Sequence, residues 1–204
     1  MRTALLLLLL TPSALANGRP ELFFREDWAE SPPAIPVDQR HVASEGLLLR
    51  LHGPGASVVK KRHHDKPADD PFYIWSGLCP GNWAVSLAHR DAAVDLTGLA
   101  KVRWRAKQAG FRRLRLILQL GDGSWVVSAD ADGPSRAWRI HEFHIADVRW
   151  RALDINTVVE GAWVDDPDLS GVRAVGFTDL MAGGRSRACS RLDWIEVYGR
   201  QVER

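Results

Sequence analysis

Residues 113–120 read Arg-Leu-Arg-Leu-Ile-Leu-Gln-Leu, and every even-numbered position in this run is leucine. A period of two places alternate side chains on opposite faces of a β-strand. The run therefore predicts a strand whose leucines at 114, 116, 118 and 120 face a buried core. Residues 102–107, Val-Arg-Trp-Arg-Ala-Lys, alternate in the same way and predict a second strand, with Trp104 in the core.

The pattern Asp-Leu-Ser/Thr-Gly occurs twice, at residues 95–98 and 168–171, and each copy precedes an extended run. The short polar side chains of such a segment can bond their own backbone and tighten a turn, after which glycine releases the chain. Two strands introduced in the same way within one short chain indicate an all-β domain.

Short strand-like runs with turn signals between them continue along the chain, and no segment has a convincing amphipathic helix pattern. Residues 147–159 are the best helix candidate and fit an irregular loop equally well. In residues 138–145 the apolar phase slips, which predicts a β-bulge near His141 and Glu142. We predict a two-sheet β-sandwich or jelly roll that occupies residues 17–204 as one domain.

The first 16 residues predict a signal peptide. Arg2 gives a positive start, residues 5–10 are all leucine, and Ala14-Leu15-Ala16 is a small-x-small cleavage site. The apolar run is shorter than the roughly 20 residues that span a bilayer. We therefore expect a secreted or periplasmic protein that is not bound to a membrane after cleavage.

Composition limits the partners. The chain has 27 basic and 25 acidic residues, so its near-neutral balance gives no reason to expect a nucleic acid partner. Its nine tryptophans suit both β-cores and sugar-stacking surfaces. The two cysteines, Cys79 and Cys189, favour a disulfide in an exported protein, and the alternative is two buried free thiols.

The order of these segments resembles the galactose-binding-like jelly rolls. In that group Asp-Leu-Ser-x-Val-x-x-Ile-Gly-Phe is followed by a loop and a closing Ile-Asp-Trp-Ile-x-Val strand, and residues 168–177 and 192–197 match both segments closely. The chain resembles in particular the family 11 carbohydrate-binding modules and the complex I intermediate-associated protein family, over residues 94–198. The resemblance implies a jelly roll and a carbohydrate partner.

Many jelly rolls of this group hold a structural calcium ion between their first and last strands. The matching carboxylates here are Asp27 and Asp193, to which backbone carbonyls could add further oxygen ligands. The alternative is that Asp193 caps a bulge or pairs with an arginine.

The first candidate site is the segment at residues 60–75, which is rich in Lys, Arg, His and Asp. A neutral histidine beside a carboxylate can act as an acid or a base, and basic neighbours can hold an anionic or polar substrate. The ligand-binding candidates here are His63, His64 and Trp75. A catalytic alternative combines Lys61 and His64 with Asp179, and a solvated charged loop is the simplest explanation.

The second candidate site is a basic stripe on the non-apolar faces of two strands, formed by Arg103, Arg105, Arg113 and Arg115. Guanidinium groups could bind uronic or sulfated sugars, or the stripe could be an outer face whose arginines pair with acidic neighbours. We take Arg115 and Gln119 as groove candidates. The tryptophans that could stack on sugars are Trp75, Trp83, Trp125, Trp138, Trp150 and Trp163, of which Trp125 and Trp163 are expected to be exposed.

Signatures of several enzyme classes are missing: the chain has no G-x-S-x-G, no E-x-D-x-x-E, and no phosphate-binding or dinucleotide-binding loop. The leading hypothesis is an exported, non-catalytic carbohydrate-binding domain with a possible calcium ion. An enzyme acting on glycosides or oxidised sugars and a protein-interaction module are the alternatives.

Overall fold

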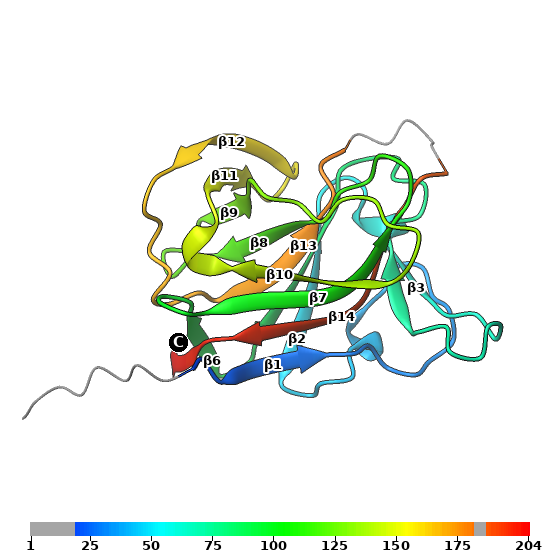
Figure 1. Cartoon of the computed structure of the whole chain (residues 1–204), viewed down its shortest axis with the longest axis horizontal. Helices are drawn as coiled ribbons and strands as arrows, with labels where there is room; N and C mark the ends of the chain where they lie inside the picture. Colours follow the sequence, from blue (N-terminus) through cyan, green and yellow to red (C-terminus); the bar gives the residue numbers. More distant parts are fainter. Residues whose placement is uncertain (1–18, 182–186) are drawn as a thin grey trace, which may run out of the picture.

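The computed structural model describes residues 19–181 and 187–204 (Figure 1). The predicted signal peptide, residues 1–16, lies outside these residues. The described residues form β-strands and three short 3₁₀ helices, η1 (Gln39–His41), η2 (Ala56–Val58) and η3 (Ile145–Asp147). All strand pairs in the two large sheets are antiparallel. The predicted all-β jelly roll is confirmed.

Two large sheets and one small sheet make up the fold. Sheet A has the order β10 (Arg139–His144), β7 (Lys101–Gln108), β14 (Ser190–Tyr198), β4 (Tyr73–Trp75) and β3 (Lys60–Arg62), and β1 (Leu22–Glu26) also pairs with β14. Sheet B has the order β12 (Val159–Val164), β11 (Trp150–Asp154), β9 (Trp125–Ser128), β8 (Arg115–Gln119), β13 (Ala174–Thr178), β5 (Ala84–His89) and β2 (Leu47–His52). The small sheet pairs β6 (Ala92–Asp95) with β15 (Arg200–Glu203).

The core lies between sheets A and B, and the leucine run of residues 113–120 faces it as predicted. Leu114, Leu116, Leu118 and Leu120 are all buried in the main apolar cluster. Trp104 of β7 enters the same cluster from sheet A and is fully buried. Because each large apolar side chain removed from water contributes about 1.5–3 kcal/mol, this alternation is what holds the two sheets together.

The two Asp-Leu-Ser/Thr-Gly copies form the predicted turns. Asp95 Oδ1 accepts hydrogen bonds from the backbone N and the hydroxyl of Thr97 at 2.9 and 2.7 Å, and Asp168 Oδ1 does the same for Ser170 at 3.0 and 2.6 Å. The copies also lie side by side, since the strand residue Val94 exchanges two backbone hydrogen bonds with Val172. The repeat thus joins two segments that are far apart in sequence.

Two local predictions need correction. The bulge expected near His141 and Glu142 is absent, because β10 pairs with β7 without a register shift. The apparent phase slip arises from Ile140, which points outward and is 55% exposed. Register shifts occur in other strand pairs, among them one in β14 between Leu192 and Trp194. Residues 147–159, the helix-or-loop candidate, form β11 and the turn that follows it.

The predicted disulfide is also absent, since Cys79 and Cys189 are both buried free thiols. The thiol of Cys79 lies 3.6 Å from the carbonyl oxygen of Ser76, to which it can donate, and burial raises the pKa of this thiol. The two cysteines therefore behave as small apolar residues of the core, which was the alternative that the sequence allowed.

Candidate functional site

The predicted groove residues Arg115, Gln119 and Trp125 share the outer face of sheet B. Gln119 and Trp125 are directly opposite each other on β8 and β9, and Arg115 lies on the same face of β8. The Trp125 ring reaches across this face to His52 of β2, with 5.2 Å between the ring centroids. Two of the strands between them, β13 and β5, present mostly small residues to this side, namely Ala84, Ser86, Ala88, Ala174 and Gly176.

The turn between β11 and β12 folds over this face and covers Trp125. Leu153 and the fully buried Val158 pack with Trp125 in a second apolar cluster. The side-chain amide of Asn82 donates a 2.9 Å hydrogen bond to the carbonyl oxygen of Val158, which ties the turn to the opposite edge of the sheet. Trp125 is consequently only 9% exposed, so the expectation of an exposed ring at this position was wrong.

Arg115 is bound by the same β11–β12 hairpin. Its guanidinium donates to the carbonyl oxygen of Ser128 and forms a 2.9 Å ion pair with Glu160 of β12. The Gln119 amide reaches only Gly123, at 3.5 Å. Arg115 therefore holds the β11–β12 hairpin, and the part of the outer face of sheet B around Trp125 is covered by the protein's own residues.

An open hollow lies beside this covered face, at the end of the sheet formed by β11 and β12. Its volume is about 780 Å³, and it lies between η3 and the segment that runs from β12 to the second Asp-Leu-Ser-Gly turn. Residues on its wall include Ala146, Val148, Arg149, Trp163, Asp165 and Asp166. Trp163 is 49% exposed here, as the sequence predicted. We call this hollow the Trp163 pocket.

Arg149, which directly precedes β11, and Arg151 of β11 both contact the Trp163 ring. The guanidinium carbons of Arg149 and Arg151 lie 4.7 and 4.8 Å from the ring centroid, within cation–π distance. Arg151 is also bound to the carbonyl oxygen of Gly161 and to Glu160. The side chain of Arg149 has no such second partner among the described residues, so it can turn toward a ligand without breaking another polar contact.

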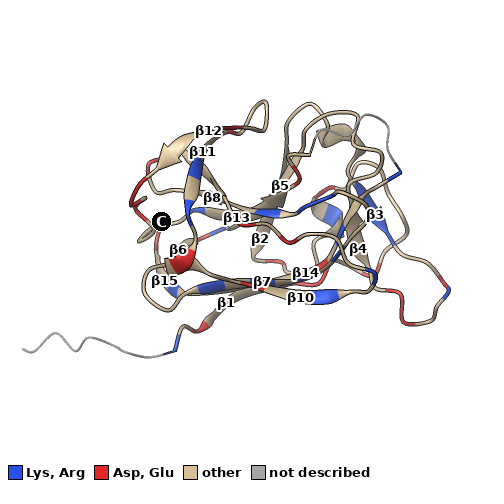
Figure 2. Ribbon diagram, turned by 45° about the horizontal axis from the view of Figure 1, so that its top comes forward, with Lys and Arg blue, Asp and Glu red and all other residues tan. Residues whose placement is uncertain are grey.

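Two carboxylates complete the Trp163 pocket. Asp165 and Asp166 follow β12 directly, both are exposed, and neither forms an ion pair or a side-chain hydrogen bond with a described residue. Figure 2 shows basic positions on β11 and acidic positions on the segment that follows β12, at the same end of the molecule. The pocket therefore combines an open aromatic ring with hydrogen-bond donors and acceptors that are not used elsewhere. Sequence reasoning could name Trp163 from the acidic residues that follow it, but it missed Arg149, which meets the Trp163 ring only once β11 and β12 pair.

The candidates of the basic loop do not form one site. His64 Nδ1 lies 2.9 Å from Asp70 and 3.3 Å from the hydroxyl of Tyr73. Lys61 points into the core and His63 stacks on Phe72 with 4.1 Å between centroids. Trp75 lies on the opposite face of its sheet from Lys61.

Asp179 is a structural residue in this fold. Its carboxylate accepts hydrogen bonds from the hydroxyl of Ser190 at 2.9 Å and from the backbone of Met181, and it lies 3.5 Å from the buried Arg112. None of these contacts involves Lys61 or His64. The described residues therefore do not bring together the predicted catalytic group.

The predicted calcium carboxylates lie near each other, but each is paired with an arginine. Asp27 forms an ion pair with Arg25, with a shortest N–O distance of 2.6 Å, and Asp193 forms one with Arg105 at 2.7 Å. Burial raises the pKa of Asp193 to about 6. Calcium needs six to eight oxygen ligands, and no group of three or more His, Cys, Asp or Glu within the described residues is arranged to hold a metal. The residues at this position therefore do not fit a calcium site.

The described helices include none with the length and apolar character needed to cross a membrane.

Comparison with known proteins finds similarity in structure only. No family model matches the chain, and no curated protein matches its sequence. The family 11 carbohydrate-binding module of the cellulosomal cellulase Lic26A-Cel5E of Clostridium thermocellum has a TM-score of 0.51 and 14% identity, over 84% of this chain and 97% of that one. The family 11 module from Clostridium thermocellum in complex with a β-1,3-1,4-mixed-linked tetrasaccharide has a TM-score of 0.50 and 14% identity, over 86% of this chain and 100% of that one. At this identity the likeness concerns the fold, and it confirms the predicted resemblance at that level.

Proposed function

We propose that this protein is an exported, non-catalytic carbohydrate-binding domain whose ligand, an uncharged sugar, binds in the Trp163 pocket. The observation that carries the proposal is the open ring of Trp163 beside Arg149, Asp165 and Asp166. Export rests on the signal peptide predicted at residues 1–16, and N-terminal sequencing of the mature protein tests it.

The pocket chemistry suits a sugar. A sugar ring presents one apolar face of C–H groups, which packs on an aromatic ring, and a rim of hydroxyl groups, which needs both donors and acceptors. Trp163 provides the apolar surface, Arg149 can donate, and the carboxylates of Asp165 and Asp166 can accept. The two carboxylates would repel an anionic sugar, which favours an uncharged one.

The size of the pocket agrees with this class of ligand. Its volume of about 780 Å³ lies within the roughly 300–1,000 Å³ of most small-molecule sites. The proposal assigns no catalytic role to His64 and Asp179, because each has separate partners and neither lies in the pocket.

The test is a glycan array of uncharged oligosaccharides, followed by calorimetry on each hit with the wild type and Trp163→Ala. We expect wild-type binding and at least a tenfold loss in the variant. Phe111→Ala is a matched control, because Phe111 is also an exposed aromatic residue with an arginine at 4.9 Å but lies outside the pocket. Silence of the wild type across the array, or equal losses in both variants, would refute the proposal.

A further inference from the structure

The outer face of sheet A carries a row of residues that none of the functions above uses. In the strand register, Lys60 of β3 lies opposite Trp75 of β4, Trp75 opposite Arg191 of β14, and Arg191 opposite Lys107 of β7. Neighbouring strands lie about 4.8 Å apart, so these four side chains emerge side by side. Arg62 stands next to them on β3. We call Lys60, Arg62, Lys107 and Arg191 the cationic row.

The cationic row differs from the other end of the same face in how its charges are paired. Arg103 of β7 lies opposite Glu196 of β14 and forms a 3.0 Å ion pair with it. Four positions farther along β7, Lys107 lies opposite Arg191 instead. Like charges directly opposite each other are destabilising, and natural sequences break such local rules mainly at functional sites.

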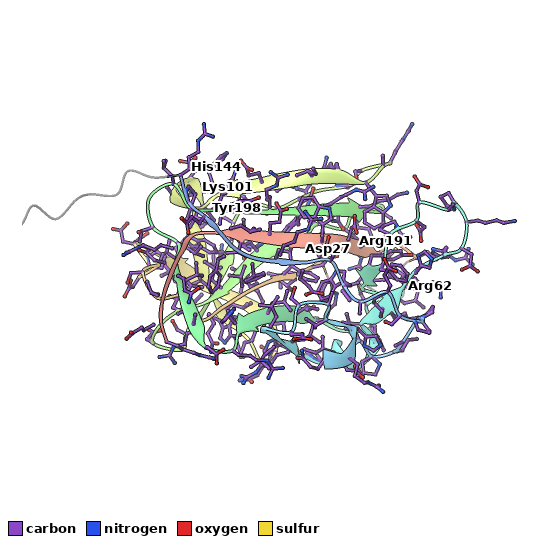
Figure 3. The ribbon with its side chains drawn as sticks, turned by 90° about the horizontal axis from the view of Figure 1, so that it is seen from below. Asp27, Arg62, Lys101, His144, Arg191 and Tyr198 are labelled. Carbon is purple, nitrogen blue, oxygen red and sulfur yellow. The ribbon has the colours of Figure 1, made fainter. Side chains whose placement is uncertain are left out.

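No member of the cationic row forms an ion pair with a described carboxylate, whereas at the other end Lys101 pairs with Glu142 at 2.9 Å. Trp75 positions two of the cations: the Lys60 ammonium lies 4.7 Å and the Arg62 guanidinium carbon 5.8 Å from its ring centroid. Figure 3 shows Arg62 and Arg191 together at one end of this face, with Lys101 at the opposite end. The row is therefore a half-exposed, partly preorganised cluster of positive charge.

We propose that the cationic row binds the carboxylate or sulfate groups of an anionic polysaccharide. Arginine forks match the geometry of both groups, and the two lysines add charge beside them. This site is separate from the Trp163 pocket and takes a different class of sugar, so it goes beyond the proposed function.

A polysaccharide fits better than a nucleic acid because of the acidic residues on the same face. Asp70 and Asp193 lie beside the row and Glu196 lies farther along it, so the positive area is short. Double-stranded DNA carries a negative charge about every 1.7 Å of its axis and would meet these carboxylates. A chain with a single anionic group per sugar can place its charges on the row and avoid them.

The test measures the binding of polygalacturonate and of κ-carrageenan, which carry at most one anionic group per sugar, to the wild type, Lys107→Glu and Arg173→Glu. The first variant replaces a like-charge pair with an opposite-charge pair, so we expect a melting temperature no lower than that of the wild type and binding about tenfold weaker. Arg173 is exposed and lies on the segment before β13, so Arg173→Glu makes the same charge change away from the row. We expect it to bind within twofold of the wild type, and all binding to weaken with added salt.

The outcomes separate this inference from the proposed function. Binding of either polymer that Lys107→Glu weakens and Trp163→Ala retains supports a separate anionic site, whichever result the uncharged glycans give. No binding of either polymer by the wild type, equal weakening by Arg173→Glu, or tighter binding of single-stranded DNA than of both polymers would overturn it.

Discussion

Trp125 and Trp163 both belong to the β9–β11–β12 end of sheet B, yet only one of them is available to a ligand. Trp125 lies under the β11–β12 turn and is part of an apolar cluster, whereas Trp163 stands at the sheet edge with half of its surface exposed. Both indole rings contact a polar side chain: His52 lies against Trp125, and arginines lie against Trp163. The difference therefore comes from the hairpin that covers one ring and carries the other.

This contrast assigns different roles to two aromatic residues that look alike in sequence. A covered ring contributes to stability through its contacts, and an open ring contributes to binding through its free surface. Substitutions should therefore separate the two effects.

The largest effect is expected for Trp125→Ala. Removing a buried tryptophan costs about 3–5 kcal/mol of unfolding free energy, because it leaves a cavity between the sheet and the hairpin. Trp163→Ala should cost about 1 kcal/mol or less, since the ring is exposed. Urea unfolding of both variants measures this, and equal costs would contradict the covered-versus-open distinction.

Neighbouring lysines on β3 sharpen the distinction, because Lys60 lies half-exposed over Trp75 and Lys61 is fully buried over Phe72. Burial lowers the pKa of Lys61 from 10.5 to about 8, and its ammonium has no hydrogen-bond partner among the described residues. A change of one unit in pKa corresponds to about 1.4 kcal/mol of free energy between the charged and neutral forms. We expect Lys61→Met to raise the unfolding free energy at pH 7, by an amount on the order of 3 kcal/mol at most.

The lowered pKa of Lys61 also predicts how the free energy of unfolding changes with pH. Between about pH 8 and 10.5 the unfolded chain keeps a proton on Lys61 that the folded protein has lost, so wild-type stability should rise with pH across this window. Lys61→Met should lose that rise, and Lys60→Met should keep it. Denaturant unfolding at several pH values checks both variants, and an unchanged slope in Lys61→Met would rule out this account.

A smaller effect is expected for the hydrogen bond that holds the covering turn. Asn82→Ala removes the donor to the Val158 carbonyl oxygen and should cost about 1–2 kcal/mol. Hydrogen exchange should also become faster across residues 150–164, because the turn is released from the sheet. Asn156→Ala, on the exposed part of the same turn, serves as the control and should leave exchange unchanged.

The smallest expected effect concerns Asp27 and Asp193, an exposed and a buried carboxylate that are each paired with an arginine. We expect no measurable change in melting temperature on adding calcium or a chelator, because these carboxylates already have cationic partners. A rise with calcium would restore the metal site that the resemblance implied.

The two sheets of the fold could be predicted from the sequence, but the β11–β12 hairpin that covers part of sheet B could not. The leucines of residues 113–120 and Trp104 could be placed because alternation is a local property of a strand. The strand β12 was missed, since five of its six residues are exposed and show no alternation. The burial of Trp125 depends on Val158, more than thirty residues later, and no local pattern carries that information.

The candidate site could likewise be predicted only in part. Trp163 could be named from the acidic residues beside it, but its pairing with Arg149 and Arg151 depends on the register of β11 and β12. On β7, the register with β14 decides that Arg103 of the basic stripe meets a glutamate while Lys107, farther along the strand, meets an arginine. Strand register is set by the whole sheet, and a single sequence does not reveal it.

The Trp163 pocket and the cationic row lie at opposite ends of the molecule: in Figure 1 the end of β12 is at the left and β3 is at the right. If both proposed sites bind their ligands, one sugar chain in the pocket and a second, acidic chain on the row would be joined by a single domain. Its retention on a material that contains both polymers would then exceed its affinity for either polymer alone.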